Sequence, residues 1–309
     1  MPSADTAEAT EVLVRTSEPP KLRVRRRLRE LAEHREILTN LVRKELKVRY
    51  ATSALGVVWS MLNPLLYLAV FGVVFTFFLK SGIPDFPVFL LSGIVAWTLF
   101  STAVGQATTS IVGNANLVSK VAFPREILPL ASIGAALVNF AFQLLVLIAF
   151  TLVIGHGLGS GLVLLPLAFA VLVVFTTALA LLVSAFNVRY RDTQHLVELG
   201  LLAWFWLTPI VYPAGTIAKK FAESGWSFDL FLINPLADIV LGFQRALYGA
   251  SAVGTEGGGF ASEGSAILPD PGLAYYALRL GIVGAASLLL LFLSWRFFFN
   301  RSGDFAEEL

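Results

Sequence analysis

Six stretches of this chain are apolar over the length of a membrane-spanning helix. About 20 mostly apolar residues are needed to cross the hydrocarbon core of a bilayer, because each helical residue adds about 1.5 Å. The stretches are residues 56–79, 87–112, 127–154, 162–186, 196–212 and 273–299. The fifth is shorter than the others and ends at a pair of prolines, Pro209 and Pro213. The pattern predicts an all-α polytopic membrane protein whose six transmembrane helices lie within residues 51–300.

Composition supports this class and excludes several kinds of chemistry. The chain is 56% hydrophobic and 14% charged, whereas soluble domains are about 25% charged. It has no cysteine, so disulfides, thiolate catalysis and cysteine-bound metals are excluded. Its three histidines, His34, His156 and His195, are far apart in the sequence. We therefore expect no metal and no cofactor bound by this chain.

The chain begins with a polar tail and a basic segment. Residues 1–20 are polar, so we expect a disordered tail and no cleavable signal peptide. Within residues 21–50, leucines recur at helical spacing between many basic residues, which include Arg35, Arg43, Lys44, Lys47 and Arg49. This pattern predicts an amphipathic helix on the cytoplasmic membrane surface, where something can dock. The alternative is a basic flank that only sets topology.

The distribution of lysine and arginine orients the predicted spans. With the N-terminus inside, the cytoplasmic segments beyond the basic helix carry Lys120, Arg125, Arg189, Arg191, Arg296 and Arg301. The external segments carry Lys80, Lys219, Lys220, Arg245 and Arg279. Because positive residues concentrate on the cytoplasmic side, both termini are predicted to be cytoplasmic, including a short tail at 301–309.

Two cytoplasmic connections have distinctive sequences. Residues 114–126 predict a short helix across the inner ends of two spans, with Asn114 or Asn116 as its cap and Pro124 in the first turn of the next span. Residues 187–195 predict a compact charged turn. There, Asp192 can cap the following helix or pair with Arg189 or Arg191.

The connection between the fifth and sixth spans is too long for a simple loop. Residues 228–249 are helical in pattern; Asn234 and Pro235 start a helix that Asp238 and Arg245 interrupt. This predicts interfacial or re-entrant helices within 214–249 on the outer side, where non-helical backbone must be sheltered by protein or water. The glycine- and serine-rich residues 250–272 predict a flexible external loop.

The sequence carries no recognisable nucleotide-hydrolysing motif or catalytic centre. It lacks the GxxxxGK[ST] phosphate loop and the common hydrolase motifs. Glu198 is the exception to a near absence of charge within the spans, whereas ion-coupled carriers use intramembrane ionisable groups. We therefore expect a non-enzymatic membrane subunit whose energy comes from another polypeptide.

Aromatic side chains on the second and fifth predicted spans leave two interpretations open. They are Trp97, Phe100, Trp204, Phe205, Trp206 and Tyr212. Such residues form belts at membrane interfaces. Alternatively, ring faces lining a conduit would stack weakly on sugar rings and let a polymer slide.

Five motifs, in this order, carry a resemblance to a known family. They are RYATSALGVVWSMLNPLL at 49–66, NANLVSKVAFPREILPL at 114–130, NVRYRD at 187–192, TPIVYP at 208–213 and NPLADIVLGFQRALYG at 234–249. The chain, from about residue 29 onward, resembles the membrane subunit of type-2 ABC transporters that export O-antigen, teichoic acid or galactan. The loop at 250–272 is longer than the family usually has.

The resemblance implies a homodimer in the bacterial plasma membrane with two copies of a separate ATPase, which binds ATP and Mg. The segment 114–124 would be the coupling helix, carried by Asn114, Asn116, Leu117, Lys120, Phe123, Pro124 and Arg125. The basic helix would contact the ATPase, and residues 214–249, with Asn234, Pro235 and Arg245, would form an external gate. The substrate would be a polyprenyl-diphosphate-linked glycan.

Three other functions remain open from the sequence. A related type-2 ABC permease could export a drug or small lipid. An autonomous flippase for lipid-linked glycans would need coupling charges in the membrane, which Glu198 alone supports thinly. A membrane acyl- or glycosyltransferase would need a polar catalytic cluster, for which residues 187–195 are the candidate.

Overall fold

A computed structural model describes residues 24–50, 62, 66, 69–70, 73–74, 82–155, 159–249, 266–269 and 271–309. These residues form helices, and no β-strand occurs among them. The predicted tail at 1–20, nearly all of the predicted first span at 56–79 and most of the loop at 250–272 lie outside the described residues.

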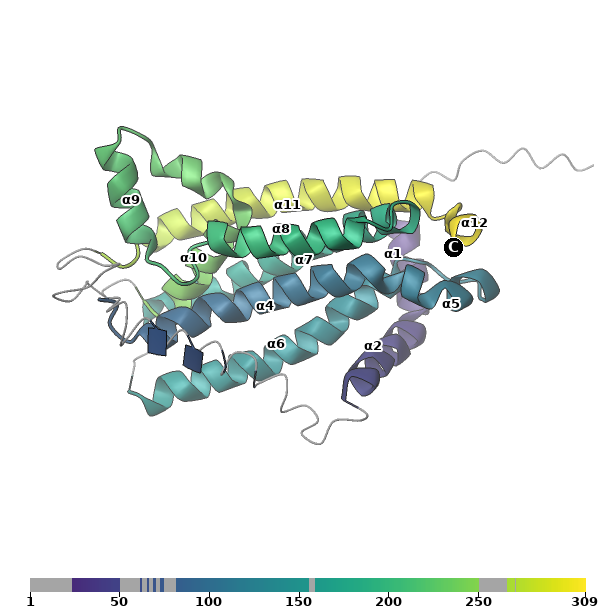
Figure 1. Cartoon of the computed structure of the whole chain (residues 1–309), viewed down its shortest axis with the longest axis horizontal. Coiled ribbons are helices and arrows are strands. Elements are labelled where there is room, and N and C mark those ends of the chain that lie inside the picture. The colour runs from purple at the N-terminus through teal and green to yellow at the C-terminus, as the bar shows by residue number, and fades with distance from the viewer. Residues whose placement is uncertain are drawn as a thin grey trace, which may run out of the picture.

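Four long apolar helices lie side by side in the bundle (Figure 1). They are α4 (Phe86–Ser110), α6 (Ile127–Val153), α7 (Leu165–Arg189), which follows the 3-10 turn η3 (Ser160–Leu164), and α11 (Leu273–Arg301). Each is long and apolar enough to cross a membrane. The second, third, fourth and sixth predicted spans are therefore confirmed as long apolar helices.

Helix α4 is at the centre of this bundle. Its most apolar window is 78% buried, against 22% for that of α11. It packs against α6, α7, α8 and α10, and α7 runs along α11.

The close approach of α10 to α7 and α11 depends on a small residue. A Cβ on Gly242 of α10 would lie 3.2 Å from Ala168 Cβ of α7 and 3.1 Å from Leu280 Cδ1 of α11.

The fifth predicted span differs from expectation. Helix α8 (Thr193–Leu207) has 15 residues, a length of about 22 Å that is short of the roughly 30 Å hydrocarbon core. It ends at Leu207 because Pro209 lacks an amide donor and its ring disfavours helix at the preceding residue. The freed carbonyls find partners, since Asn234 Nδ2 donates to Leu207 O (3.1 Å) and Gln244 Nε2 donates to Pro209 O (2.9 Å).

Three short helices follow at one end of the bundle, on the left of Figure 1. They are α9 (Ala214–Glu223), η4 (Phe228–Ile233) and α10 (Pro235–Leu247). Helix α10 is almost wholly buried, whereas Ala214 is the one fully buried residue of α9. The segment predicted to hold re-entrant or interfacial helices is therefore helical, and α10 re-enters the bundle between α4, α7 and α11.

The other end of the bundle, here called the basic end, carries the remaining short helices (Figure 1). They are α1 (Val24–Glu33), α2 (Arg35–Tyr50), η2 (Val112–Asn114), α5 (Ala115–Lys120) and α12 (Phe305–Glu308). The single basic helix predicted at 21–50 is divided at His34, whose Nδ1 contacts Glu30 O at 2.7 Å. A second apolar core, smaller than the main one, joins α2, α5, α6, α7, α11 and α12 here.

Candidate functional site

The connection between α4 and α6 forms a short helix at the basic end. Val118 of α5 is buried, and Leu117 and Phe123 pack against the smaller core. Asn116 and Lys120 are exposed on the outer surface. Pro124 is buried in the turn that leads into α6. The segment is therefore anchored by its apolar side and presents polar side chains outward.

Asn114 does not have the predicted capping role. It stands at the N-cap position of α5 but makes no side-chain cap hydrogen bond, and Asn116 lies inside the helix. Instead, Asn114 Nδ2 donates to Ser110 O (2.8 Å), and Oδ1 accepts from Lys44 Nζ (2.9 Å). Both partners lie outside α5, so this side chain bonds to α4 and α2 in place of the first turn of α5. It thereby connects the start of α5 to α2.

Most of the basic residues of α1 and α2 face outward. Exposed among them are Arg25, Arg26, Arg29, Arg35, Arg43, Lys44 and Lys47; the side chain of Arg49 lies outside the described residues. The opposite face of α2 packs on α6, where a Cβ on Gly134 would lie 2.7 Å from Val42 Cγ2. Ser132 Oγ of α6 donates to Glu45 Oε1 (2.9 Å). The basic surface is thus held firmly to the bundle.

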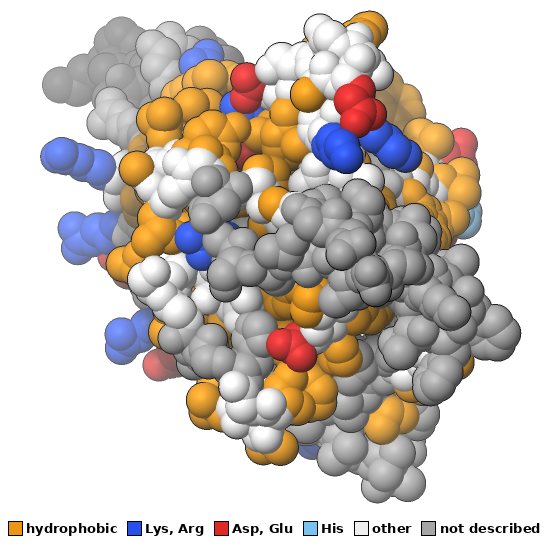
Figure 2. Space-filling view, turned by 90° about the vertical axis from the view of Figure 1, so that its left-hand side faces the viewer, with side chains coloured by type: hydrophobic (Ala, Val, Ile, Leu, Met, Phe, Trp, Pro, Cys, Tyr) orange, Lys and Arg blue, Asp and Glu red, His pale blue; other side chains and the backbone are white. Residues whose placement is uncertain are grey.

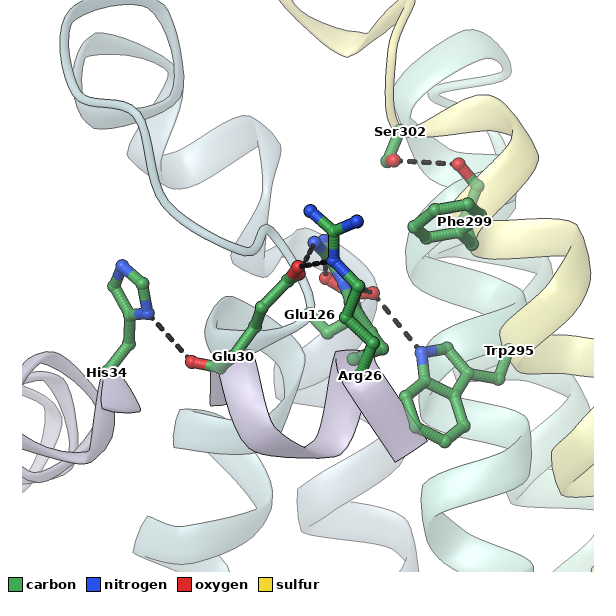
Figure 3. A network of polar contacts seen from close by, with 8 residues as sticks. Arg26, Glu30, His34, Glu126, Trp295, Phe299 and Ser302 are labelled. Carbon is green, nitrogen blue, oxygen red and sulfur yellow. Dashed lines mark hydrogen bonds and ion pairs between the residues drawn. The ribbon is translucent and has the colours of Figure 1, made fainter. Parts of the chain in front are cut away.

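Glu126 is the most deeply placed charge at the basic end, and the sequence analysis missed it. Its residue is 1% exposed and stands at the start of α6. Arg27 Nε and Nη2 donate to its two carboxylate oxygens at 2.9 and 2.7 Å, and Trp295 Nε1 donates to Oε1 at 3.2 Å. Figure 3 shows Glu126 between α1 and Trp295 of α11.

A sequence signal for this network existed. Val24, Arg27 and Leu31 lie on one helical face, so Arg27 occupies the side of α1 that points toward the bundle. Glu126 is a lone acid immediately before an apolar span. Pairing the two across 99 residues required the fold.

Arg125 connects the same corner to the C-terminal segment. Its Nη1 donates to Ser302 O and, at 3.5 Å, to Gly303 O. Phe305 of α12 is 1% exposed and meets Phe298 edge-on, with ring centroids 5.3 Å apart. Helix α12 also contacts α5. Residues predicted to be a simple tail therefore pack beside the connection that precedes α6.

The predicted cytoplasmic turn connects α7 to α8 and is exposed. Arg189 stacks over the ring of Tyr190, with 5.7 Å from Cζ to the centroid. Arg191 is exposed, and Asp192 is at the N-cap position of α8 without a side-chain cap hydrogen bond. The predicted cap is therefore absent. This turn places both arginines on the surface.

The aromatic residues of the second and fifth predicted spans separate into buried and exposed groups. Phe100 is fully buried, stacked on Phe175 (5.8 Å) and edge-on to Trp204 (5.5 Å). Trp97 and Phe205 are also buried and meet edge-on at 5.5 Å. These three side chains hold α4 to α7 and α8, so they offer no ring face to a conduit.

Three aromatic side chains on or after α8 remain at least partly accessible, and Trp204 is one of them. Trp206 is 54% exposed. It shares one face of α8 with Leu196, Leu199 and Leu202, which are also exposed. Tyr212 is partly buried, and its hydroxyl donates to Trp206 O (2.8 Å).

At the opposite end, Asn234 is a junction between α8 and α10. Its Oδ1 caps α10 by accepting from Leu236 N (3.1 Å) and also accepts from Trp204 Nε1 (2.8 Å). Pro235 occupies the first turn of α10, where its missing amide donor is not needed. Arg245, in the last turn of α10, is partly buried.

A mostly apolar cavity of about 800 Å³ opens beside this junction. Trp204, Trp226, Phe221 and Phe231 supply aromatic walls, and Lys220 adds a charge. Figure 2 shows this end of the molecule, where apolar side chains are gathered on the surface with a few charged ones among them. The described residues contain no group of three His, Asp or Glu placed to hold a metal ion.

Comparisons with known proteins agree on a transporter family. A family model described as ABC-2 type transporter matches residues 37–248. The O-antigen export system permease protein RfbA of Myxococcus xanthus is 33% identical over 284 residues, which cover 92% of this chain and 99% of that protein. The protein of the same name from Klebsiella pneumoniae is 31% identical over 210 residues, 68% of this chain and 79% of the relative. The polysialic acid transport protein KpsM of Escherichia coli is 23% identical over 64% of this chain.

Proposed function

Because this chain belongs to the ABC-2 type transporter family, we propose that it is the membrane subunit of an ATP-driven polysaccharide exporter. The observation that carries the proposal is similarity to an O-antigen export permease over nearly the full length of both chains. The substrate class is a polymer linked to a polyprenyl diphosphate, such as O-antigen, teichoic acid or galactan. Export would proceed across the bacterial plasma membrane.

ATP and Mg would be bound by a separate ATPase subunit, in two copies. Helix α5 is the proposed docking element for it, because α5 is anchored by apolar contacts and exposes Asn116 and Lys120. The exposed basic residues of α1 and α2 would flank the same contact. This arrangement requires the basic end, and with it both termini, to face the cytoplasm, in line with the distribution of positive residues.

The conduit would form between two copies of this chain. The exposed face of α8 that carries Trp206 is the described surface best suited to line it, because its large apolar side chains are exposed. The predicted first span lies mostly outside the described residues, and we propose that it lines the conduit with α8. The external gate would be α9, η4 and α10, which close the opposite end around Asn234.

The proposed cycle begins with ATP binding, which brings the two ATPase subunits together. Their movement is passed to the bundle through α5 and the basic helices. The copies of α8 then separate, and the polymer advances toward the outer side. This chain performs no bond-breaking chemistry in that cycle.

The proposal is tested by export from cells that lack this chain. Restoring the chain should return the polysaccharide to the cell surface, and Lys120→Glu should reduce export at least tenfold, because it reverses an exposed charge at the docking helix. Lys219→Glu, an exposed lysine on α9 at the opposite end, is the matched control and should leave ATPase binding unchanged. Normal export by the Lys120 variant would refute the docking role.

The same assay separates the alternative substrates. If surface polysaccharide is normal without this chain while resistance to a drug or transport of a small lipid is lost, the chain is a permease for that compound. Export that proceeds without any ATPase would instead favour an autonomous flippase.

A further inference from the structure

The carboxylate of Glu126 joins three separate elements at the basic end. Arg27 comes from α1, Glu126 from the corner between α5 and α6, and Trp295 from α11. Both carboxylate oxygens are occupied, with the guanidinium in a two-pronged arrangement. Such a pair fixes direction as well as distance, because the planar fork of arginine fits a carboxylate in one orientation.

Arg27 is enclosed on its remaining sides. Its side chain is 17% exposed; Nη1 donates to Glu30 at 2.8 Å, and Cζ lies 5.1 Å from the ring centroid of Phe299 on α11. Burial works against its charge, but the bonds to Glu126 and Glu30 hold the pKa of Arg27 above its ordinary value. The guanidinium is therefore a permanently charged connector between α1, the α5–α6 corner and α11.

Net stabilisation does not account for an ion pair this deep. Taking both charges out of water costs about as much as their attraction returns, so apolar side chains of the same volume hold such positions equally well. What an ion pair adds is a defined relative orientation of the elements that carry it. Here those elements are α6, which begins just after Glu126, together with α1 and α11.

The neighbouring residue strengthens the connection to α11. Arg125 bonds to the backbone oxygens of Ser302 and Gly303 just after α11 ends. Figure 3 shows Ser302 and Phe299 on the same side of Glu126 as Trp295. A displacement of α5 that moves residues 125 and 126 must therefore move α1 and the end of α11 with them, or break bonds to a buried charge.

We propose that Arg27, Glu126 and Trp295 form a connector that passes movement of α5 to α1 and α11, with Glu126 as a positioning residue for transport. This inference rests on the proposed function, since it assumes that α5 receives the movement of an ATPase. Glu126 does not touch substrate or nucleotide. Its role is to keep α1 and α11 in register with the α5–α6 corner during each cycle.

The test uses the complete complex reconstituted in nanodiscs, with export and ATP hydrolysis measured together. Arg27→Gln should lower the polymer exported per ATP at least fivefold while ATP hydrolysis continues. Arg29→Gln is the matched control, because Arg29 is on the same helix, is 83% exposed and, within the described part of the chain, pairs with Glu33 four residues on. It should retain the export per ATP of the unmodified complex.

A distance measurement gives a readout that a purely structural role would not change. The chain has no cysteine, so spin labels can be placed at Arg25→Cys on α1 and Ala122→Cys beside α5, both exposed positions. The distance distribution should stay narrow with and without trapped ATP. With Arg27→Gln added, it should broaden when ATP is trapped, because α1 no longer follows α5.

A double variant guards against simple misfolding. Arg27→Met with Glu126→Leu replaces both charges by apolar side chains, so the complex should assemble but export little per ATP. Normal export per ATP in this variant would overturn the proposal, as would an unchanged distance distribution in Arg27→Gln. Failure of the proposed function is seen separately, as absence of ATP-dependent export by the unmodified complex.

Discussion

Removing the carboxylate of Asp238 should strongly destabilise the end of the bundle that carries α9. Asp238 of α10 is 4% exposed, and Arg279 of α11 donates to its two oxygens at 3.2 and 3.1 Å. Arg279 also donates to Leu232 O at 2.8 Å. Truncating one member of a buried pair leaves an uncompensated charge and costs about 3–5 kcal/mol. Because Arg279 keeps its bond to Leu232 and is 19% exposed, we expect Asp238→Ala to cost about 2–4 kcal/mol.

The same arginine offers a matched control. Asp229 of η4 lies 3.4 Å from Arg279 Nη1, but its side chain is 66% exposed. Water screens a pair of this kind, so Asp229→Ala should cost about 0–1 kcal/mol. The free energy of unfolding is measured on the detergent-solubilised chain by titration with a denaturing detergent, followed through tryptophan fluorescence. Equal costs for the two variants, or less than about 1 kcal/mol for Asp238→Ala, would refute the argument from burial.

The buried and exposed aromatic groups should separate in the same way. Phe100→Ala should lower the free energy of unfolding by about 3–5 kcal/mol, because Phe100 is fully buried. Trp206→Ala should leave the free energy of unfolding nearly unchanged and reduce polymer export. The reverse pattern would return Trp206 to a structural role. Acidification should weaken the attachment of α1. The pKa of Glu30 lies below its ordinary value because Arg27, and then Arg26, donate to its carboxylate, so its stabilising effect is present at neutral pH and lost as pH falls through that lowered pKa. Relative to the intrinsic exchange rate at each pH, the amides of α1 should lose protection from hydrogen exchange on acidification, and Glu30→Gln should abolish the change attributable to this residue.

Hydropathy predicted the four long described helices because length alone distinguishes a span from a buried core helix. It did not give the end of the fifth predicted span, where α8 stops at Leu207 before Pro209. A run of apolar residues looks the same whether it forms one helix throughout or a helix that ends partway along it. What decides is the set of partners for the freed carbonyls, and Asn234 and Gln244 supply these from distant positions.

The facing of side chains could not be predicted from composition. By residue type alone, Trp97 and Phe100 could face lipid, a conduit or the protein core. The packing of α4 between α6, α7 and α8 places them in the core. Asn114 is another example: a residue typical of helix caps instead bonds to Lys44, a contact 70 residues away in sequence. The pair formed by Arg27 and Glu126 was missed for the same reason.

ATP-dependent export by a purified complex tests the central claim most directly. This chain would be reconstituted into vesicles with its ATPase subunit and a lipid-linked polysaccharide, and the protection of the polymer from an added glycosidase would be followed over time. We predict that the polymer crosses the vesicle membrane, and so changes its accessibility to the glycosidase, only when ATP is hydrolysed and only when this chain is present. Hydrolysis of ATP by an assembled complex without any movement of the polymer would contradict the account.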